Sequence, residues 1–430
     1  MATQTPRIAI IGAGPVGLTL AAILHRNGIK ATIFERDGSA TVRAQGGTLD
    51  IHAESGQRAV AAAGLMAEFK RFARPEGDVA RVVKKDGTVL LDENEQAPVE
   101  KGAKREEADD EERHGRPEID RRDLKDLLLR ALPEGTVRWG KGVASMSPVE
   151  GTKQWTLTFL DSPSPSSESE SGPYDLVCGA DGTWSRVRPV LTDVRPQYSG
   201  VSALDVWISA EHLAARPDVA RFIGNGSVFM CAADRFLSVQ RHGDGGARAY
   251  ACVRTFPGPG GPVPSEASLL GLTGEEAEGE VDWTDERTRS RFLDRHFGDF
   301  AQEVKEVLLA MTEQPSLRHL YMLPVGHRWT PRAGATLLGD AAHVMTPFAG
   351  VGVNVGMTDA MELAEGIVGY VKDGAKGGDE LARVVEAYEE GMFGRSSKDA
   401  AFTARMLEVE FQDDGCENIA KIMSGEAPPA

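Results

Sequence analysis

Residues 7–36 read RIAIIGAGPVGLTLAAILHRNGIKATIFER and predict a complete βαβ unit. An apolar strand leads into the motif Gly12-x-Gly14-x-x-Gly17, an apolar helix follows, and a second strand ends at Glu35. Gly12 permits a tight turn, Gly14 lets the backbone approach a pyrophosphate, and Gly17 allows close packing of helix on strand. Glu35 is placed to accept hydrogen bonds from ribose hydroxyls. The unit therefore predicts dinucleotide binding and leaves FAD and NAD undecided.

A second motif, LLGDAAHVMTPFAGVGVN, occupies residues 337–354. It predicts a short buried strand, a turn and the start of an apolar helix. Asp340 comes at the strand end, where a carboxylate can hold polyol hydroxyls. Gly350 and Gly352 lack side chains, so backbone amides can approach an isoalloxazine edge, and the helix dipole would stabilise negative charge on a reduced flavin. The alternative is an ordinary turn before a capped helix. Together with the first motif, this segment favours FAD.

The bulk composition is that of a globular enzyme. The chain has 430 residues, 41% hydrophobic and 26% charged residues, and a formal charge of −17, which predicts two to three domains and argues against nucleic acid as a partner. Four separated cysteines show no metal-ligand spacing, so we expect reduced thiols, no metal site and a cytoplasmic location. No apolar run reaches the ~18 residues of a membrane span, and we expect a monomer.

Three polar stretches, residues 93–115, 161–173 and 257–280, predict solvated loops. Residues 161–173 separate two strand-like runs, QWTLTFL and YDLVCGA. This arrangement predicts a hairpin with a long loop.

A third motif, YDLVCGADGTWSRVRP, places Asp181-Gly182 at a turn after an apolar strand, followed by Ser185, Arg186 and Arg188. With all three motifs in place, the sequence resembles the group A flavin-dependent aromatic hydroxylases, to which p-hydroxybenzoate hydroxylase belongs. Within that family it is most similar to the tetracycline-inactivating monooxygenases. The similarity is carried by GGTLDIHAESGQRAV, RPEIDRRDLKDLLL, QWTLTF and GDAAHVMTPFAGVGVN, and it extends over nearly the whole chain.

The resemblance implies roles for individual residues. Glu35 and Arg36 correspond to adenosine contacts, Asp50 and Arg121 to flavin contacts, Asp340 to the ribityl contact and Arg43 to a contact with NADPH. Arg121 and Arg43 also have the simpler interpretation of surface charges. The predicted cofactor site consists of Gly12, Gly14, Pro15, Gly17, Glu35, Arg36, Arg43, Gly47, Asp50, Arg121, Asp181, Asp340, Pro347, Gly350, Gly352 and Asn354. No catalytic side chain is assigned, because the flavin carries the chemistry.

The substrate region departs from the tetracycline-inactivating group. The glutamine, arginine and histidine that hold tetracycline there are replaced, at roughly aligned positions, by Asp205, Ser227 and Tyr250. Phe348 is retained, and Asp205, Tyr250 and Phe348 are the predicted substrate residues. His343 has two interpretations, a packed structural histidine or a pocket residue. Tetracycline itself is therefore an open question as substrate.

The resemblance implies an α/β fold with a Rossmann-like, discontinuous FAD-binding domain and an interleaved, mostly antiparallel β-sheet substrate domain. The expected FAD-binding domain comprises residues 1–75, 112–192 and 318–378, the substrate domain residues 76–111 and 193–317, and a bridging C-terminal helix residues 379–430.

The implied reaction is that of a single-component monooxygenase of secondary metabolism or antibiotic modification. NADPH reduces FAD, dioxygen adds to give a flavin C4a-hydroperoxide, and an electron-rich aromatic or enolic, polyketide-like molecule is hydroxylated. A single nucleotide motif fits this family, which has no separate nicotinamide domain. The alternatives are a FAD-dependent reductase or oxidase of the same fold, or a non-catalytic flavoprotein that binds aromatic compounds.

Overall fold

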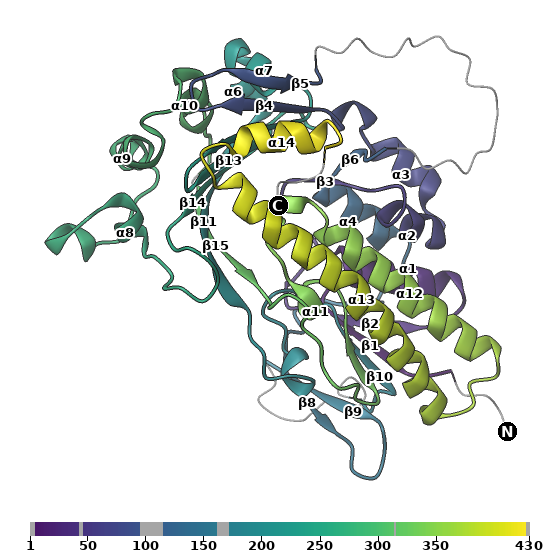
Figure 1. Cartoon of the computed structure of the whole chain (residues 1–430). Helices are drawn as coiled ribbons and strands as arrows, with labels where there is room; N and C mark the ends of the chain where they lie inside the picture. Colours follow the sequence, from purple (N-terminus) through teal and green to yellow (C-terminus); the bar gives the residue numbers. More distant parts are fainter. Residues whose placement is uncertain (1–4, 43–45, 95–114, 161–171, 314, 427–430) are drawn as a thin grey trace, which may run out of the picture. The chain divides into compact units, whose positions relative to one another are not determined.

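The computed structural model describes residues 5–42, 46–94, 115–160, 172–313 and 315–426 (Figure 1). Residue contacts divide the chain into two compact units, each assembled from three segments. Unit 1 consists of Met1–Ala73, Arg121–Pro196 and Met322–Thr403, and unit 2 of Arg74–Asp120, Gln197–Tyr321 and Ala404–Ala430. Both units are therefore discontinuous in sequence.

Unit 1 contains a five-stranded parallel sheet in the order β16-β10-β1-β2-β7. Its strands are β1 (Ile8–Ile11), β2 (Ala31–Phe34), β7 (Val137–Arg138), β10 (Leu176–Gly179) and β16 (Ala335–Leu337). β1 and β10 are buried along their whole length, as expected for inner strands of a parallel sheet that is covered on both faces. The Rossmann-like sheet predicted from the sequence is confirmed.

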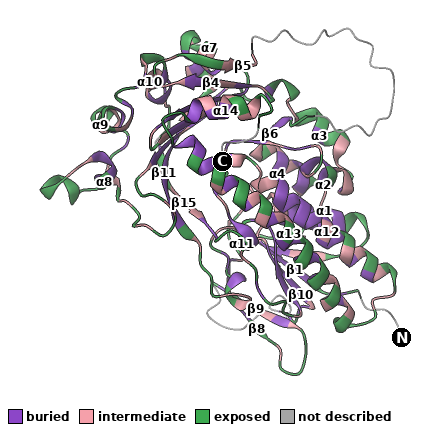
Figure 2. Cartoon of the chain, in the orientation of Figure 1, coloured by how far each residue is buried: buried purple, intermediate pink, exposed green. Residues whose placement is uncertain are grey.

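Helices α1 (Pro15–Arg26) and α12 (Gly352–Lys372) pack against each other in unit 1. Most of α1 is buried, as Figure 2 shows. The packing requires small residues, since a Cβ at Gly356 of α12 would lie only 2.6 Å from the Val16 side chain of α1. The shorter helices are α2 (Gly56–Ala62), α3 (Met66–Phe72), α4 (Arg121–Arg130) and α11 (Asp340–His343). Within the described residues, no helix combines the length and apolarity that a membrane span requires.

The hairpin expected around residues 161–173 is reduced to one antiparallel bridge, between Trp155 and Tyr174. β9 (Trp155–Phe159) pairs with β8 (Val143–Pro148), whereas β10 pairs in parallel with β1 and β16. β10 belongs to the parallel sheet because the apolar residues of this strand are buried there on both faces. Residues 161–171 of this expected loop, and 95–114 of the first one, lie outside the described residues.

Unit 2 contains a seven-stranded sheet in the order β15-β11-β14-β13-β12-β4-β5. Its strands are β4 (Ala80–Lys84), β5 (Val89–Asp92), β11 (Gln197–Ile208), β12 (Ser227–Ala232), β13 (Arg235–Arg241), β14 (Ala247–Arg254) and β15 (Ser316–Met322). β4 and β12 are parallel, while β4–β5, β12–β13, β13–β14 and β11–β14 are antiparallel. The mostly antiparallel sheet predicted from the sequence is confirmed. Two further short strands are β3 (Thr48–Asp50), in unit 1, and β6 (Glu118–Asp120), in unit 2.

The two faces of the seven-stranded sheet differ in chemistry. Leu204, Val206 and Ile208 of β11 lie in the hydrophobic core of unit 2. Because side chains alternate along a strand, Asp205 and Trp207 point to the opposite face. The helices of unit 2 are α6 (Ala210–Ala214), α7 (Pro217–Ile223), α8 (Glu266–Leu270), α9 (Glu286–Phe297) and α10 (Gln302–Leu309).

The C-terminal segment expected over residues 379–430 contains two helices, the first of them long. α13 (Gly378–Glu410) ends before a short turn, and α14 (Gly415–Met423) follows. A Cβ at Gly415 would lie 2.9 Å from the carbonyl oxygen of Glu410, so the chain reverses tightly at a position suited to glycine. The bridging role expected for this segment stays a prediction.

A buried carboxyl group joins α13 to the sheet of unit 1. Glu389 is fully buried, and its Oε1 accepts hydrogen bonds from Trp329 Nε1 at 3.0 Å and Thr336 Oγ1 at 2.7 Å. Its Oε2 is buried with no hydrogen-bond partner in the described part of the chain. Burial raises the pKa of Glu389 to about 7. The carboxyl group is therefore protonated in the native state over the acidic range.

We expect Glu389→Gln to weaken the pH dependence of stability. The native wild type keeps this proton up to about pH 7 and the unfolded chain releases it near 4.5, so wild-type stability falls through that window and stays low above it. This pKa difference corresponds to about 3 kcal/mol, so the variant should be more stable above pH 7. Urea unfolding below pH 4.5 and above pH 7 measures the free energy of unfolding of each variant, with Glu390→Gln at the exposed neighbouring position as control. Equal pH dependence in wild type and Glu389→Gln would contradict the assignment.

Candidate functional site

Four strands of the unit 1 sheet end at one edge, because neighbouring strands are parallel. β1 leads into Gly12, β2 into Glu35, β10 into Asp181 and β16 into Asp340. In an open α/β sheet, ligands bind outside this carboxyl edge. The fold therefore brings together predicted cofactor residues from three distant parts of the sequence.

The glycine loop between β1 and α1 has little room for side chains. Gly12 has a φ of +105°, and a Cβ there would overlap the carbonyl oxygen of Ala180. Around Gly14, by contrast, a Cβ would meet nothing within 4 Å. α1 begins at Pro15 with no side-chain cap, so the positive end of the helix and its backbone N–H groups are available to an anion.

Glu35 is fixed beside this loop by backbone donors. Its Oε2 accepts a hydrogen bond from the Ala13 N–H at 2.7 Å, and its Oε1 accepts one from the Asp37 N–H at 3.0 Å. The neighbouring Arg36 is exposed. The structure thus places the acid at the end of β2 next to the start of α1.

Arg188 ties the loop after β10 to the start of α11. Its buried guanidinium donates to three carbonyl oxygens, those of Thr183 at 2.8 Å, Asp340 at 2.9 Å and Ala341 at 2.8 Å. Burial lowers the pKa of Arg188, and the charges of Asp181 and Asp340 oppose that shift. Sequence reasoning noted this arginine without giving it a role, because carbonyl acceptors leave no pattern in side chains.

Asp181 has one satisfied and one unsatisfied oxygen. Its Oδ2 accepts a hydrogen bond from the Arg186 N–H at 2.7 Å. Its Oδ1 is buried and finds no partner among the described residues. Burial raises the pKa of Asp181 above its ordinary value. A buried acceptor without a donor at the ligand edge indicates a site that a bound group completes.

The turn before α12 also leaves backbone accessible. Pro347–Ala349 form a short 3-10 turn, Gly350 has a φ of +67°, and α12 starts at Gly352 without a side-chain cap. A Cβ at Gly352 would meet nothing within 4 Å, while Phe348 is buried. A second uncapped helix start therefore lies beside a glycine-lined stretch, as the sequence predicts.

Asn354 is buried, and its side-chain amide is used within the protein. Its Nδ2 donates to the carbonyl oxygen of Asp50 at 2.8 Å, and its Oδ1 accepts from the His52 N–H at 2.9 Å. Asn354 therefore positions the segment after β3. Nearby, the Arg121 N–H donates to the Gly47 carbonyl oxygen at 3.1 Å, which joins two further predicted residues. Arg43 lies outside the described residues.

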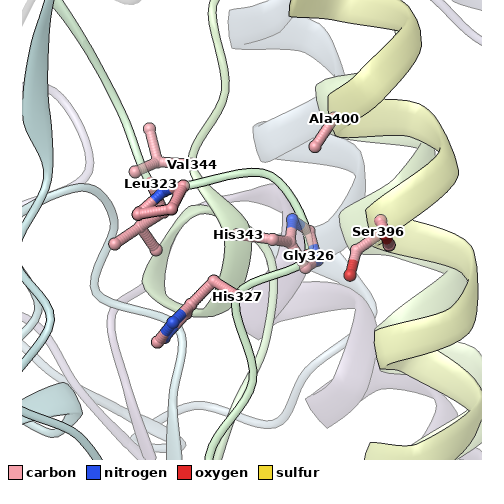
Figure 3. A pocket seen from close by; sticks show the side chains of 9 residues that line it. Leu323, Gly326, His327, His343, Val344, Ser396 and Ala400 are labelled. Carbon is pink, nitrogen blue, oxygen red and sulfur yellow. The ribbon is translucent and has the colours of Figure 1, made fainter. Parts of the chain in front are cut away.

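His343 is a buried partner of Asp359. Its Nε2 lies 2.6 Å from Asp359 Oδ2, and the Gly339 N–H donates to the same oxygen at 3.0 Å. Burial alone would lower the pKa of His343, but the adjacent Asp359 carboxylate raises it above the ordinary value. Figure 3 shows the small pocket beside this ring, lined also by His327 and Ser396. These contacts support the structural interpretation of His343.

The predicted substrate residue Asp205 lies within an ion-pair network in unit 2. It is 1% exposed, and its carboxylate accepts bonds from Arg248, with Nε to Oδ1 at 2.6 Å, and from Arg318 Nε at 2.5 Å. The Arg248 guanidinium lies over the rings of Trp207 and Tyr250. Both carboxylate oxygens of Asp205 are therefore occupied by arginines, and its role as a substrate residue stays a prediction. The exposed member is Arg318, whose side chain is 55% accessible.

The family model described as FAD binding domain matches residues 5–235 and 273–383. The chain belongs to this family.

Its relatives are named as monooxygenases. Monooxygenase penA of Penicillium thymicola is 31% identical, with the alignment covering 98% of this chain and 99% of that protein. Monooxygenase asqM of Emericella nidulans is 30% identical over 97% of this chain and 98% of its own length. This protein is therefore an FAD-dependent monooxygenase, as the sequence motifs predict.

Solved structures share the fold. The crystal structure of FqzB has a TM-score of 0.72 at 18% identity, covering 100% of this chain and 90% of that one. Tetracycline destructase Tet(55) has a TM-score of 0.66 at 18% identity, covering 99% and 96%. The expected likeness in fold to the tetracycline-inactivating enzymes is confirmed.

FAD fits the residues at this edge. The open backbone at Gly14 and the uncapped start of α1 suit a pyrophosphate, and the unpartnered Asp181 Oδ1 offers an acceptor. The open backbone at Gly352 leaves a second helix start free for the ring. The two helix starts offer backbone N–H donors and Asp181 offers an acceptor, so the edge has both kinds of hydrogen-bonding group that FAD requires.

We expect Arg188→Met to lower both the stability of the apoprotein and its FAD affinity. The substitution leaves three carbonyl acceptors without their donor, and each unsatisfied buried group costs about 1–3 kcal/mol. Thermal melting and titration of FAD fluorescence measure the two effects. Arg186→Met, an exposed arginine of the same loop, serves as the matched control. Wild-type behaviour of Arg188→Met would show that the two loops hold their positions without it.

Proposed function

We propose that this monooxygenase is a single-component enzyme that uses NADPH and dioxygen to hydroxylate an electron-rich aromatic or enolic small molecule. The observation that supports it most is the convergence of the glycine loop, Glu35, Asp181 and Asp340 at one sheet edge. We further propose that unit 1 binds the cofactor and that unit 2 contributes substrate contacts.

Each part of the edge has a proposed role in holding FAD. Glu35 and Arg36 contact the adenosine end, and the start of α1 holds the pyrophosphate with Asp181 beside it. Asp340 holds the ribityl chain. The remaining proposed contacts to the ring are Asp50, Arg121, Pro347, Gly350 and Gly352. Bound FAD supplies electron transfer and dioxygen activation, while the chain's residues bind the ring, orient it and stabilise its negative charge through the α12 dipole.

We propose that NADPH docks transiently on the FAD-binding unit. The sequence contains one nucleotide fingerprint, and Arg43 is the residue that the family resemblance assigns to NADPH. An arginine suits this role, because its guanidinium pairs with phosphate in two parallel bonds.

The chemistry of unit 2 favours an acidic or enolic substrate. Arg318 is held in place by the buried Asp205 and remains half exposed, so it offers an oriented cation. Tyr250 and Trp207 add aromatic surface on the same sheet. Phe348 of unit 1 is a proposed aromatic contact. A tetracycline-like polyketide is one member of this substrate class.

We expect the purified protein to be yellow, with FAD that acid precipitation releases, because the motifs place no His or Cys for a covalent link. Asp340→Ala should weaken FAD binding about ten- to hundred-fold, since a hydrogen bond to a charged acceptor contributes about 1.5–3 kcal/mol. Fluorescence titration of the apoprotein gives the affinity, with the exposed Asp373→Ala at the far end of α12 as control. A wild-type protein that binds no FAD would overturn the proposed function.

We expect a planar phenolic or enolic substrate to speed flavin reduction by NADPH, since gating by substrate avoids wasteful peroxide release. Stopped-flow absorbance of the oxidised flavin measures the rate, and isotopically labelled dioxygen traces the inserted atom. Product oxygen from water, or a product without new oxygen, would favour a reductase or oxidase. If no aromatic ligand that binds accelerates NADPH oxidation, the protein is a binding flavoprotein instead.

A further inference from the structure

Residues 50–56 are fastened to the first turn of α12. The His52 N–H donates to Asn354 Oδ1 at 2.9 Å, and Asn354 Nδ2 donates to the Asp50 carbonyl oxygen at 2.8 Å. Ser55 Oγ adds a longer bond of 3.4 Å to the same Oδ1. A Cβ at Gly56 would lie 2.5 Å from that oxygen. These contacts fix the backbone that carries Asp50 and His52.

The side chains of Asp50 and His52 form a pair on this fixed backbone. His52 Nε2 lies 2.8 Å from Asp50 Oδ2. The His52 side chain is 11% exposed and that of Asp50 is 27% exposed. The other ring nitrogen lies 3.7 Å from Oε1 of the largely exposed Glu54, which is too long for a hydrogen bond. The bond to Asp50 is therefore the strong polar contact of the ring.

Asp50 also faces the glycine turn. A Cβ at Gly350 would lie 3.6 and 3.7 Å from the two carboxylate oxygens of Asp50. Gly350 leaves this space free, and its φ of +67° suits glycine. The carboxylate thus lies next to both His52 and the glycine-lined stretch that we propose for the flavin ring.

We propose that His52 is a positioning residue for the cofactor, which directs the Asp50 carboxylate so that it accepts a hydrogen bond from an N–H of the isoalloxazine ring. The inference rests on the proposed function and deepens it. A donor on Oδ2 stops the carboxylate from rotating and leaves Oδ1 as the free acceptor. Without His52 the same carboxylate turns between several orientations, and part of the binding energy is spent in ordering it.

A double-mutant cycle on FAD affinity tests this role. The variants are His52→Phe, Asp50→Asn and the double variant, each in the full-length chain. We expect each single substitution to weaken FAD binding about tenfold, the loss of roughly one charge-assisted hydrogen bond. The double variant should bind FAD about as tightly as the single variant with the lower FAD affinity, because His52 acts through Asp50. His52→Gln, which can still donate to Asp50, should restore most of the affinity.

The readouts separate positioning from simple packing. Melting of the apoprotein reports packing, while the FAD titration reports positioning, and Glu54→Gln is the matched control for charge beside the ring. If His52→Phe does not fold, His52→Asn replaces it in the cycle, since its shorter side chain cannot reach Asp50 in the same way.

Each outcome bears on the proposal. Wild-type affinity in His52→Phe, or effects that add fully in the double variant, would overturn it while the proposed function survives. A lower melting temperature with unchanged FAD affinity would reduce His52 to a packing residue. Failure of the wild type to bind FAD would overturn the inference and the proposed function together.

Discussion

The carboxyl edge of the unit 1 sheet depends on one buried cation, Arg188. Arg188 donates hydrogen bonds to carbonyl oxygens of the loop after β10 and of the start of α11. The first segment carries Asp181 and the second carries Asp340. A guanidinium is suited to this because its donors point in fixed directions and its charge is hard to remove. Desolvation lowers the pKa of this guanidinium, and the charges of Asp181 and Asp340 oppose that shift. Arg188 therefore holds together the two segments that carry Asp181 and Asp340.

The position of the helices around this edge also depends on glycines, which let neighbouring backbones approach closely. Val16 of α1 lies against Gly339 after β16 and against Gly356 of α12, and a Cβ at either glycine would press on it at 3.1 or 2.6 Å. Larger residues would separate the two helices and move their uncapped starts away from the edge. The same contacts that fill the interior thus fix the positions of the two uncapped helix starts.

The sequence was informative where the signal is local and less so where it depends on pairing between distant strands. Neighbouring residues are enough to predict the turn at Gly12, the acid at Glu35 and the strand end before Asp340. The structure places all three at the carboxyl edge of the parallel sheet. The pairing of Asp205 with Arg248 and Arg318 depends on the register of β11 with its neighbours, which no short pattern encodes. Strand β10 was assigned the wrong partner for the same reason, since a buried apolar run fits several sheets equally well.

Because unit 1 is built from three segments, it cannot be completed until the last of them, Met322–Thr403, has been translated. β10 gains its edge neighbour β16 only when residues near Ala335 have left the ribosome, long after Val177 has been made. Until then the nascent chain carries an apolar strand with an open edge, which is prone to pairing with other chains. Contacts between such distant residues also slow folding itself. A chain that stops short of β16 would therefore expose a sticky strand edge as well as lacking Asp340, so premature termination would yield an aggregation-prone fragment.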